Sequence, residues 1–468
     1  MYKYLLCWRY LRTRYIALAS VISVMLGVAT MIVVNSVMAG FSEKMRDRLH
    51  GVLADVIVES RDFNGFRNSD EVMARIREVA GDDVEAMAPT METFALLEWT
   101  FRGQPITRQV QLIGIQPEER AKTGDFAEFL FDERGRKIPP SFAIPDRIKH
   151  DNPAGQMLQD LGPDDELIRK ALEDRVEEQS SDHGAIIGFA IGHAHVQGKD
   201  LCIAPPGTQV RLTFPQAGRK PGVTWDTPVV VGYFKSGMSE YDSTHVYMPI
   251  EQLQKMRLLA DPTGRGKGAV NQIQLKARAG VDLDDLANRV ELALEQLKPG
   301  GYFMVATWEK KQGPLLAAVA VEQSILNLLL FFIIAVAGFG ILAIFSMIVV
   351  EKTRDIGVLK ALGASTSGVR GIFLGYGLSL GIVGSGVGMI GGLLFVRYIN
   401  PIEALLSRLT GRKVFDDSIY YFSEIPTQVV PSTVCWIVGG ALLIAVVASV
   451  WPAQRAARLR PVQALRFE

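Results

Sequence analysis

Cysteine is scarce in this chain of 468 residues, which contains only Cys7, Cys202 and Cys435. No two of them lie close together in the sequence, so we expect neither a disulfide framework nor a thiolate metal site. A net charge of one sign is also absent, because 50 basic residues balance 50 acidic ones. No global field therefore points to nucleic acid or to an acidic substrate.

The familiar motifs of enzymes are lacking as well. The chain has no Gly-x-Ser-x-Gly, no His-Glu-x-x-His and no Gly-x-x-x-x-Gly-Lys-Ser/Thr phosphate loop. Gly386-x-Gly388-x-x-Gly391 matches the dinucleotide pattern, but it lies in an apolar run with no strand before it. Gly384, Gly388 and Gly392 recur there at four-residue spacing, which favours close packing of membrane helices.

Histidine does not indicate a metal site either. His193 and His195, with His183 nearby, have no acidic or cysteine ligand at a recognisable spacing. We interpret them as surface or strand residues and predict no metal.

Long apolar runs are what the sequence does contain. Four of them reach the roughly 20 residues that a helix needs to cross a bilayer core. We predict membrane helices at residues 15–40, 324–350 (preceded by a stalk from 313), 371–396 and 429–453. The first run is too long for the h-region of a signal peptide, which spans about 7–15 residues, so we expect a retained anchor.

Lysine and arginine near the ends of these runs indicate the orientation. They gather in the N-terminal segment 1–14, in the loop 351–370 and in the C-terminal segment 454–468. These segments share one side of the membrane in a four-span chain, and cytoplasmic segments carry the excess of Lys and Arg. We therefore expect both termini in the cytoplasm, and residues 41–312 and 397–428 outside it.

The region 41–312 is predicted to form an α+β domain. Alternation of apolar and polar residues indicates half-buried strands. These strands are expected at residues 55–59, 109–115, 209–214 and 229–234. Helices are expected at 69–79, with Ser69 as the N-cap, and at 283–297. The expected fold is thus a membrane protein of four transmembrane α-helices, with a large α+β extracytoplasmic domain between the first and second.

One stretch of this region, residues 117–183, differs from the rest. It is polar, acidic and irregular, with Asp164-Asp165-Glu166 as its most charged point. We interpret it as a solvated insertion, and a partner-binding appendage is the alternative.

Two further segments carry a family resemblance. Residues 351–365 (EKTRDIGVLKALGAS) are similar to the segment that joins two membrane helices in the MacB/FtsX/Lol class of ABC transporter permeases. Residues 451–466 (WPAQRAARLRPVQALR) resemble the C-terminal signature of the same class. Residues 232–243 (GYFKSGMSEYDS), 246–249 (VYMP) and 307–310 (TWEK) resemble the lipoprotein-releasing permeases LolC and LolE. The resemblance covers nearly the whole chain, and the stretch 117–183 is its main departure.

The resemblance implies a non-catalytic permease subunit that works as a homodimer or heterodimer with an ABC ATPase. This chain has no nucleotide-binding motif, so ATP and Mg would be bound by a separate ATPase, and we expect no cofactor on this chain. The family draws lipid-anchored proteins from the outer leaflet of the cytoplasmic membrane and passes them to a periplasmic carrier. Two alternatives stay open: a MacB-like efflux or peptide-resistance permease, and an FtsX-like regulator of an extracytoplasmic hydrolase.

Two sets of site residues follow for the membrane part. The first and second spans are expected to line a cavity for the acylated anchor, with ordinary lipid-facing or core packing as the alternative. The cavity residues are Val24, Met25, Val28, Met31, Ile32, Leu328, Leu329, Phe332 and Ile333. The loop between the second and third spans is expected to form a short helix on the ATPase, with an interfacial helix on lipid as the alternative. The coupling residues are Glu351, Lys352, Arg354, Asp355, Ile356, Leu359, Lys360 and Leu362.

A third set lies in the outward region. By resemblance, residues 215–222 take the position of the carrier-docking hook of the family, although this loop is shorter. The docking candidates are Gln216, Arg219 and Lys220, and a plain hairpin tip is the alternative.

Overall fold

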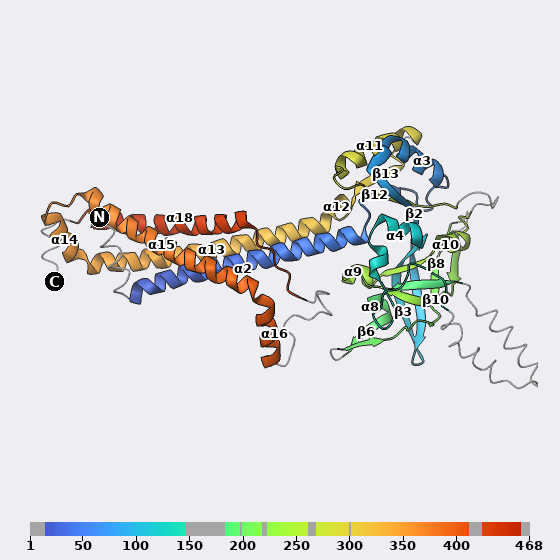
Figure 1. Ribbon diagram of the computed structural model, residues 1–468, viewed down its shortest axis with the longest axis horizontal. Coiled ribbons are helices and arrows are strands. Elements are labelled where there is room, and N and C mark those ends of the chain that lie inside the picture. Colours follow the sequence, from blue (N-terminus) through green and yellow to red (C-terminus); the bar gives the residue numbers. More distant parts are fainter. Residues whose placement is uncertain are drawn as a thin grey trace, which may run out of the picture. The chain divides into compact units, whose positions relative to one another are not determined.

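The computed structural model describes residues 15–145, 183–196, 199–217, 222–260, 268–298, 301–410 and 424–459 (Figure 1). The described residues divide into two compact units. We call them the helical unit, with the residues up to Met45 and from Leu315 onward, and the sheet domain, Arg46–Pro314.

Four helices are long and apolar enough to cross a membrane, as predicted. They are α2 (Tyr15–Val52), α13 (Gly313–Glu351), α15 (Thr366–Arg397) and α18 (Pro431–Ala457). Helix α2 continues beyond its predicted end at residue 40, so that its last turns belong to the sheet domain. Two shorter helices are also described in the helical unit, α14 (Thr353–Ala361) and α16 (Ile399–Thr410).

Small residues bring the long helices together. A Cβ atom added at Gly388 of α15 would lie 2.6 Å from the carbonyl oxygen of Met25 in α2, and one at Gly384 would lie 2.9 Å from Val24 Cβ. Nearer the start of α15, Gly377 lies against Ser449 of α18. The prediction that these glycines pack helices is confirmed, because their missing side chains let two backbones approach closely.

The described strands of the sheet domain form a main sheet of 11 strands. Its order is β13-β1-β12-β2-β3-β11-β5-β10-β4, and β8 pairs with both β2 and β9. The strands are β1 (Val56–Ser60), β2 (Val84–Phe101), β3 (Gln104–Ile115), β4 (Leu130–Phe131), β5 (Gly184–Gly188), β8 (Arg211–Gln216), β9 (Gly222–Asp226), β10 (Val229–Phe234), β11 (His245–Pro249), β12 (Gln272–Ala277) and β13 (Phe303–Thr307). Strands β6 (His193–Val196) and β7 (Lys199–Cys202) form a separate hairpin.

Short helices connect these strands. They are α3 (Ser69–Ala80), η1 (Gly81–Asp83), α4 (Pro117–Thr123), η2 (Phe126–Phe129), α8 (Phe189–Gly192), α9 (Ser239–Asp242), α10 (Ile250–Met256), α11 (Leu283–Leu297) and α12 (Trp308–Lys311). The strands and helices predicted from the sequence are all present. The predicted cap is displaced by one residue: the N-cap of α3 is Asn68, and the buried Ser69 is the first helical residue.

The central strands give the sheet two different faces, because successive side chains of a strand point to opposite sides. Strand β12 reads Gln272-Ile273-Gln274-Leu275, and β3 alternates in the same way through Gln111 and Leu112. The apolar residues of these strands join the core with Ile76 of α3 and with Leu286 and Val290 of α11. The opposite face therefore carries the glutamine and glutamate side chains, and we call it the polar face.

The predicted start of the insertion at residue 117 is wrong. Phe126 and Leu130 are fully buried, and the ring of Phe126 lies 5.0 Å from that of Tyr247 on β11. Strand β4 pairs with β10. The short apolar cluster at residues 126–131 (FAEFLF) was the available signal, and residues 117–131 are part of the domain. Residues 146–182 lie outside the described part of the chain.

Candidate functional site

A chamber of about 450 Å³ lies on the polar face of the sheet domain. Its walls come from β1, β2, β3, β12, the α9–β11 segment and the residues that border α2 and α12. The lining includes Leu53, Ile57, Glu92, Phe94, Gln109, Gln111, Tyr241, His245, Gln272, Gln274, Lys311 and Gln312. Its volume lies within the range of roughly 300–1,000 Å³ that is usual for ligand pockets.

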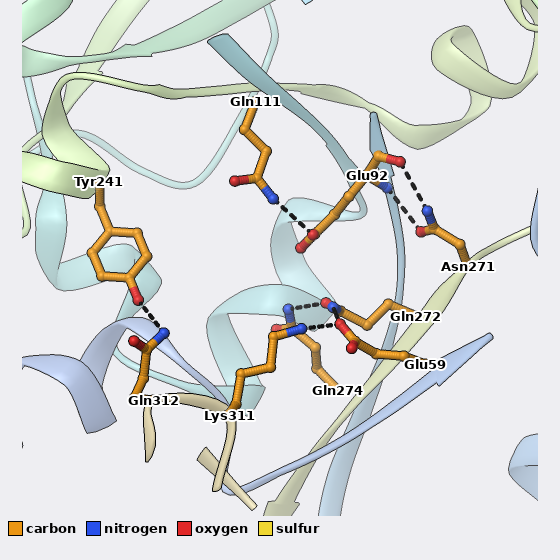
Figure 2. A network of polar contacts seen from close by, with 9 residues as sticks. All are labelled: Glu59, Glu92, Gln111, Tyr241, Asn271, Gln272, Gln274, Lys311 and Gln312. Atoms are coloured by element: carbon orange, nitrogen blue, oxygen red, sulfur yellow. Dashed lines mark hydrogen bonds and ion pairs between the residues drawn. The ribbon is translucent and has the colours of Figure 1, made fainter. Parts of the chain in front are cut away.

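A chain of hydrogen bonds runs along one wall of the chamber (Figure 2). Gln274 Nε2 donates to Gln272 Oε1 over 2.9 Å, and Gln272 Nε2 donates to Glu59 Oε1 over 2.6 Å. The ammonium group of Lys311 pairs with the same carboxylate oxygen of Glu59. The charge of Glu59 is thus compensated, and two glutamine side chains are held in fixed positions.

Glu92 occupies a second wall of the chamber. Gln111 Nε2 donates to Glu92 Oε2 over 2.9 Å, and Asn271 binds the backbone of Glu92 through both its amide oxygen and its amide nitrogen (Figure 2). Burial raises the pKa of Glu92, and the nearby carboxylate of Glu59 adds to the effect, while Lys311 opposes it. The protonated, uncharged form of this carboxyl group is therefore favoured relative to an exposed glutamate.

The third wall carries Tyr241 and His245. Gln312 Nε2 donates to the hydroxyl oxygen of Tyr241 over 2.9 Å. Burial, with a further contribution from the positive charge of Arg120, lowers the pKa of His245 to about 3, so the ring is neutral at physiological pH. The chamber therefore offers many donors and acceptors but little net charge.

The chain segments beside the chamber lead into α2 and α13. Arg120 Nη2 donates to the carbonyl oxygen of Val52, the last residue of α2, over 2.5 Å. His50 Nε2 donates to Asp55 Oδ1 over 2.5 Å, and the backbone nitrogen of Trp308 donates to the carbonyl oxygen of Asp55 over 3.1 Å. A positive side chain at a helix C-terminus is favourable. The hydrogen bonds of Arg120, His50 and Trp308 thus connect the last turn of α2 and the start of α12 to the rest of the sheet domain.

The residues predicted to line a membrane cavity fall into two groups. Leu328, Leu329, Phe332 and Ile333 of α13 are about half exposed, which leaves them free to contact lipid, an acyl chain or another chain. Val24, Val28 and Ile32 are buried in the core of the helical unit, and the glycines of α15 lie against them. The helix interface within the chain occupies these three residues, and their role as cavity residues stays a prediction. Met25 and Met31 are partly buried beside that interface.

The predicted coupling helix exists as α14, but its orientation differs from the prediction. Ile356 is 3% exposed and packs into the core with Val369 and Phe373 of α15, so little of its side chain is available to a partner. Lys360 Nζ donates to the carbonyl oxygens of Ala457 and Leu459 over 2.7 Å each. This lysine therefore stabilises the end of α18 rather than facing an acidic partner.

The solvent-facing side of α14 carries other residues of the segment. Leu362 is 81% exposed and Val358 is 44% exposed, while Leu359 is partly buried. Arg354 and Glu351 are exposed, and Lys352 pairs with Asp355 over 2.6 Å. The three-residue spacing predicted one apolar face for Ile356, Leu359 and Leu362. It could not show that Ile356 is buried in the chain's own core.

Of the predicted docking residues, Gln216 ends strand β8 opposite Gly222 of β9. Arg219 and Lys220 lie outside the described residues. Among the histidines, the ring of His193 stacks on Phe189 with 4.0 Å between ring centroids. The described residues contain no group of three or more His, Cys, Asp or Glu side chains placed to hold a metal ion.

Comparison with known proteins adds a family match for the C-terminal part. Residues 327–461 match the model of the FtsX-like permease C-terminal domain. This part of the chain is therefore similar to FtsX-like permease domains. The FtsX-like domain takes in most of α13 and all of α14, α15, α16 and α18.

Similarity to curated proteins extends over nearly the whole chain. The "Lipoprotein-releasing system transmembrane protein LolC" of Xylella fastidiosa is 26% identical, over 98% of this chain and 97% of that protein. The LolC protein of Neisseria meningitidis is 27% identical over 98% of both chains, and the LolE protein of Haemophilus influenzae is 23% identical over 99% of this chain and 98% of its own. The predicted resemblance to LolC and LolE is confirmed.

Among solved structures, the periplasmic region of MacB from Actinobacillus actinomycetemcomitans matches 58% of this chain and 97% of its own. It is 13% identical, with a TM-score of 0.28.

The chamber was not predicted from the sequence. Gln272, Gln274 and Lys311 belong to no known motif, and each is unremarkable by itself. The alternation of glutamine with isoleucine and leucine in residues 272–275 was the available signal, since it indicates a strand with one polar face.

Proposed function

We propose that this chain is a permease subunit of an ABC transporter that extracts lipid-anchored proteins from the outer leaflet of the cytoplasmic membrane. The observation that carries this proposal is the similarity, over nearly the full length, to proteins named as lipoprotein-releasing system transmembrane proteins. The FtsX-like domain and the four apolar helices support it. Both termini lie in the cytoplasm and the sheet domain lies outside it, in accord with the distribution of Lys and Arg.

The exposed side of α13 receives the acyl chains of the cargo. Removing an acylated anchor from lipid costs about 0.8 kcal/mol for each CH₂ group, so an apolar surface must replace the lipid. Leu328, Leu329, Phe332 and Ile333 provide such a surface. A second permease, either another copy or a related chain, closes the cavity from the opposite side.

ATP and Mg are bound by a separate ATPase subunit, which docks on the exposed side of α14. Leu362 and Val358 supply the apolar contact, and the exposed Arg354 supplies a positive charge beside it. The proposed docking site is therefore centred on Leu362, whereas the sequence predicted an apolar face that also included Ile356. Movement of α14 reaches the membrane helices directly, because Ile356 is packed among them.

The released protein passes to a soluble periplasmic carrier, for which Gln216, Arg219 and Lys220 stay the docking candidates. Reversal of charge in the pair Arg219→Glu and Lys220→Glu is expected to reduce capture of the carrier. Unchanged capture would reject this loop as the docking site while leaving the extraction step in place.

Reconstitution tests the extraction step. The chain, its ATPase and its partner permease are placed in proteoliposomes with a triacylated lipoprotein, and ATP-dependent release to a soluble acceptor is measured. We expect release with ATP and almost none with Leu362→Asp, because a charge at the docking surface weakens ATPase binding. Leu409→Asp is the matched control, since Leu409 on α16 is 78% exposed and lies in the segment assigned to the opposite side of the membrane.

The two outcomes separate clearly. Full release by the Leu409 variant together with lost release by the Leu362 variant supports the proposal. Absence of ATP-dependent release by the unaltered complex, with lipoproteins absent from the purified complex as well, would refute it.

A further inference from the structure

We propose that the chamber on the polar face of the sheet domain binds an uncharged, extended polypeptide segment. That this segment belongs to the lipid-anchored cargo rests on the function proposed above. Peptide binding by the chamber is argued below from the residues that line it.

Spacing along the strands is the first argument. Gln109 and Gln111 lie two residues apart on β3, and Gln272 and Gln274 lie two residues apart on β12. A strand advances about 3.3 Å per residue, so Gln109 and Gln111 leave β3 about 6.6 Å apart. The backbone groups on one side of an extended peptide recur at the same distance. The carboxamides of Gln272 and Gln274 are bonded to each other over 2.9 Å instead. A carboxamide can both donate and accept, which suits a peptide bond whatever the side chains beside it. Gln272 already bonds Glu59 and Gln274 through its nitrogen and its oxygen, so the exposed Gln109 and the oxygen of Gln274 are the groups that would meet a peptide.

An unsatisfied polar atom is the second argument. Gln274 is 5% exposed and lines the chamber, yet its Oε1 atom has no hydrogen-bond partner among the described residues. Its Nε2 atom is already committed to Gln272. A buried acceptor without a partner costs about 1–3 kcal/mol, and a peptide N–H group that enters the chamber would remove this cost.

Charge is the third argument. Lys311 pairs with Glu59, and Gln111 donates to Glu92, whose pKa burial raises. Among the described residues that line the chamber, Lys311 is the one lysine or arginine, so an acidic ligand would find no unpaired positive charge there. The exposed Glu240 adds one carboxylate to the lining. The side chain of Phe94, which is 62% exposed, offers an apolar contact at the edge of the chamber.

The chamber lies beside the two chain segments that lead into α2 and α13, which is relevant to transport. Lys311 and Gln312 are the two residues before α13, and Leu53 follows directly on α2. A peptide that competes for the Lys311–Glu59 or Gln312–Tyr241 bonds would act on both segments that lead to the membrane helices. The chamber is therefore suited to report the presence of cargo to the helical unit.

Photo-crosslinking in the complete transporter complex in nanodiscs tests this proposal. A benzophenone amino acid is placed at Phe94 in the chamber, at Phe332 on α13, and at Gln104, an exposed residue outside the chamber. Three probes are offered: a diacylglyceryl-cysteine peptide of Ser, Asn and Gly, the same peptide without acyl chains, and a phospholipid without peptide. We expect the label at Phe94 to crosslink both peptides but not the phospholipid. We expect the label at Gln104 to crosslink none of the three probes.

Variants show whether the glutamines bind the peptide. Gln272→Leu with Gln274→Leu is expected to reduce the Phe94 crosslink about tenfold, which corresponds to about 1.4 kcal/mol or one to two hydrogen bonds. Gln109→Leu is a second variant at an exposed position, where folding is not at risk, and a smaller reduction of about threefold is expected. Gln104→Leu is the matched control and should change nothing.

Each remaining outcome decides a separate point. Crosslinking of the acylated peptide at Phe332 but not at Phe94 would overturn the chamber proposal and leave the proposed function standing. Crosslinking of the unacylated peptide at Phe94, with no acyl crosslink at Phe332, would support the chamber and count against lipoprotein extraction. Displacement of the peptide by a neutral oligosaccharide at equal concentration would overturn the assignment to a peptide.

Discussion

In the helical unit many large apolar side chains lie on the outside, whereas the sheet domain buries side chains of the same kind. Trp436 of α18 is 81% exposed and Phe332 of α13 is 55% exposed, while Trp99 of β2 is 4% exposed. The interior of the helical unit combines large side chains such as Phe345 with small residues such as Gly388 of α15 and Ala445 of α18.

This difference shows which solvent each unit is built for. Water drives large apolar groups into the core of the sheet domain. Lipid gives no such drive, so helices in a membrane associate through close packing of small residues. Polar groups show the opposite trend, because the sheet domain holds a chamber of glutamines whose amide groups bond mostly to one another and to carboxylates.

Substitution of tryptophan gives the sharpest test of this contrast. Trp99→Leu should destabilise the sheet domain by about 2–4 kcal/mol, because it leaves a cavity and removes the hydrogen bond from Trp99 Nε1 to the carbonyl oxygen of Ile203. Trp436→Leu should change the stability by less than about 0.5 kcal/mol. Thermal unfolding in nanodiscs measures both, and equal losses would contradict the contrast.

Glycine substitution tests the interior of the helical unit. Gly388→Ala should destabilise the packing of α15 on α2 by about 1–3 kcal/mol, because the new methyl group would meet the Met25 carbonyl oxygen at 2.6 Å. Gly386→Ala is the control, since a Cβ there has nothing within 4 Å. It should be neutral or stabilising by about 0.5–1 kcal/mol through helix propensity. Disulfide formation between cysteines placed at Val24 and Gly384 reports the packing, and the two variants should differ in it.

Asp55 tests the polar interior of the sheet domain. Burial alone raises its pKa, but hydrogen bonds from His50 and from the Ala277 N–H group and the charge of Lys276 outweigh burial, so the net pKa is lowered. Its contribution to stability is therefore present above its unfolded pKa of about 4 and is lost as the pH falls through the lower folded value.

Asp55→Asn should thus reduce the stability at neutral pH by about 1–2 kcal/mol and flatten its decline below about pH 4. Chemical denaturation across this pH range provides the measurement. An unchanged acid slope in the variant would assign the acid sensitivity to other carboxylates.

Lys360 gives the smallest expected effect. Lys360→Met removes two hydrogen bonds to the end of α18 and should reduce its stability by about 1 kcal/mol. Arg354→Met is the control at an exposed position of the same helix and should leave stability unchanged. Hydrogen exchange of residues 454–459 compares the two variants, and equal protection would contradict the capping role of Lys360.

Much of the architecture could be predicted from local pattern. The four apolar runs predicted the membrane helices, because the bilayer thickness fixes their length. Alternation predicted β1 and β3, and helical periodicity predicted α3 and α11. The motifs at 351–365 and 451–466 indicated the permease class, which the FtsX-like match confirms.

The sites could be predicted only in part. Periodicity placed Ile356 and Leu362 on one apolar face, but it could not distinguish the side that meets the chain's own helices from the side that is exposed. The same limit applies to Val28 and Phe332, which are equally apolar in sequence. Val28 is buried because it packs against Gly388 of α15, whereas Phe332 is about half exposed.

The sequence by itself determined the number of spans, the sheet-rich domain between the first two and the family, because each depends on the composition and order of neighbouring residues. The tertiary structure decided which apolar residues are free and that a chamber exists at all. Glu59, Glu92, Gln272 and Lys311 come from four separate segments, and only the pairing of β1, β2 and β12 brings them to one face. Such a meeting depends on strand order and register, which local sequence does not encode.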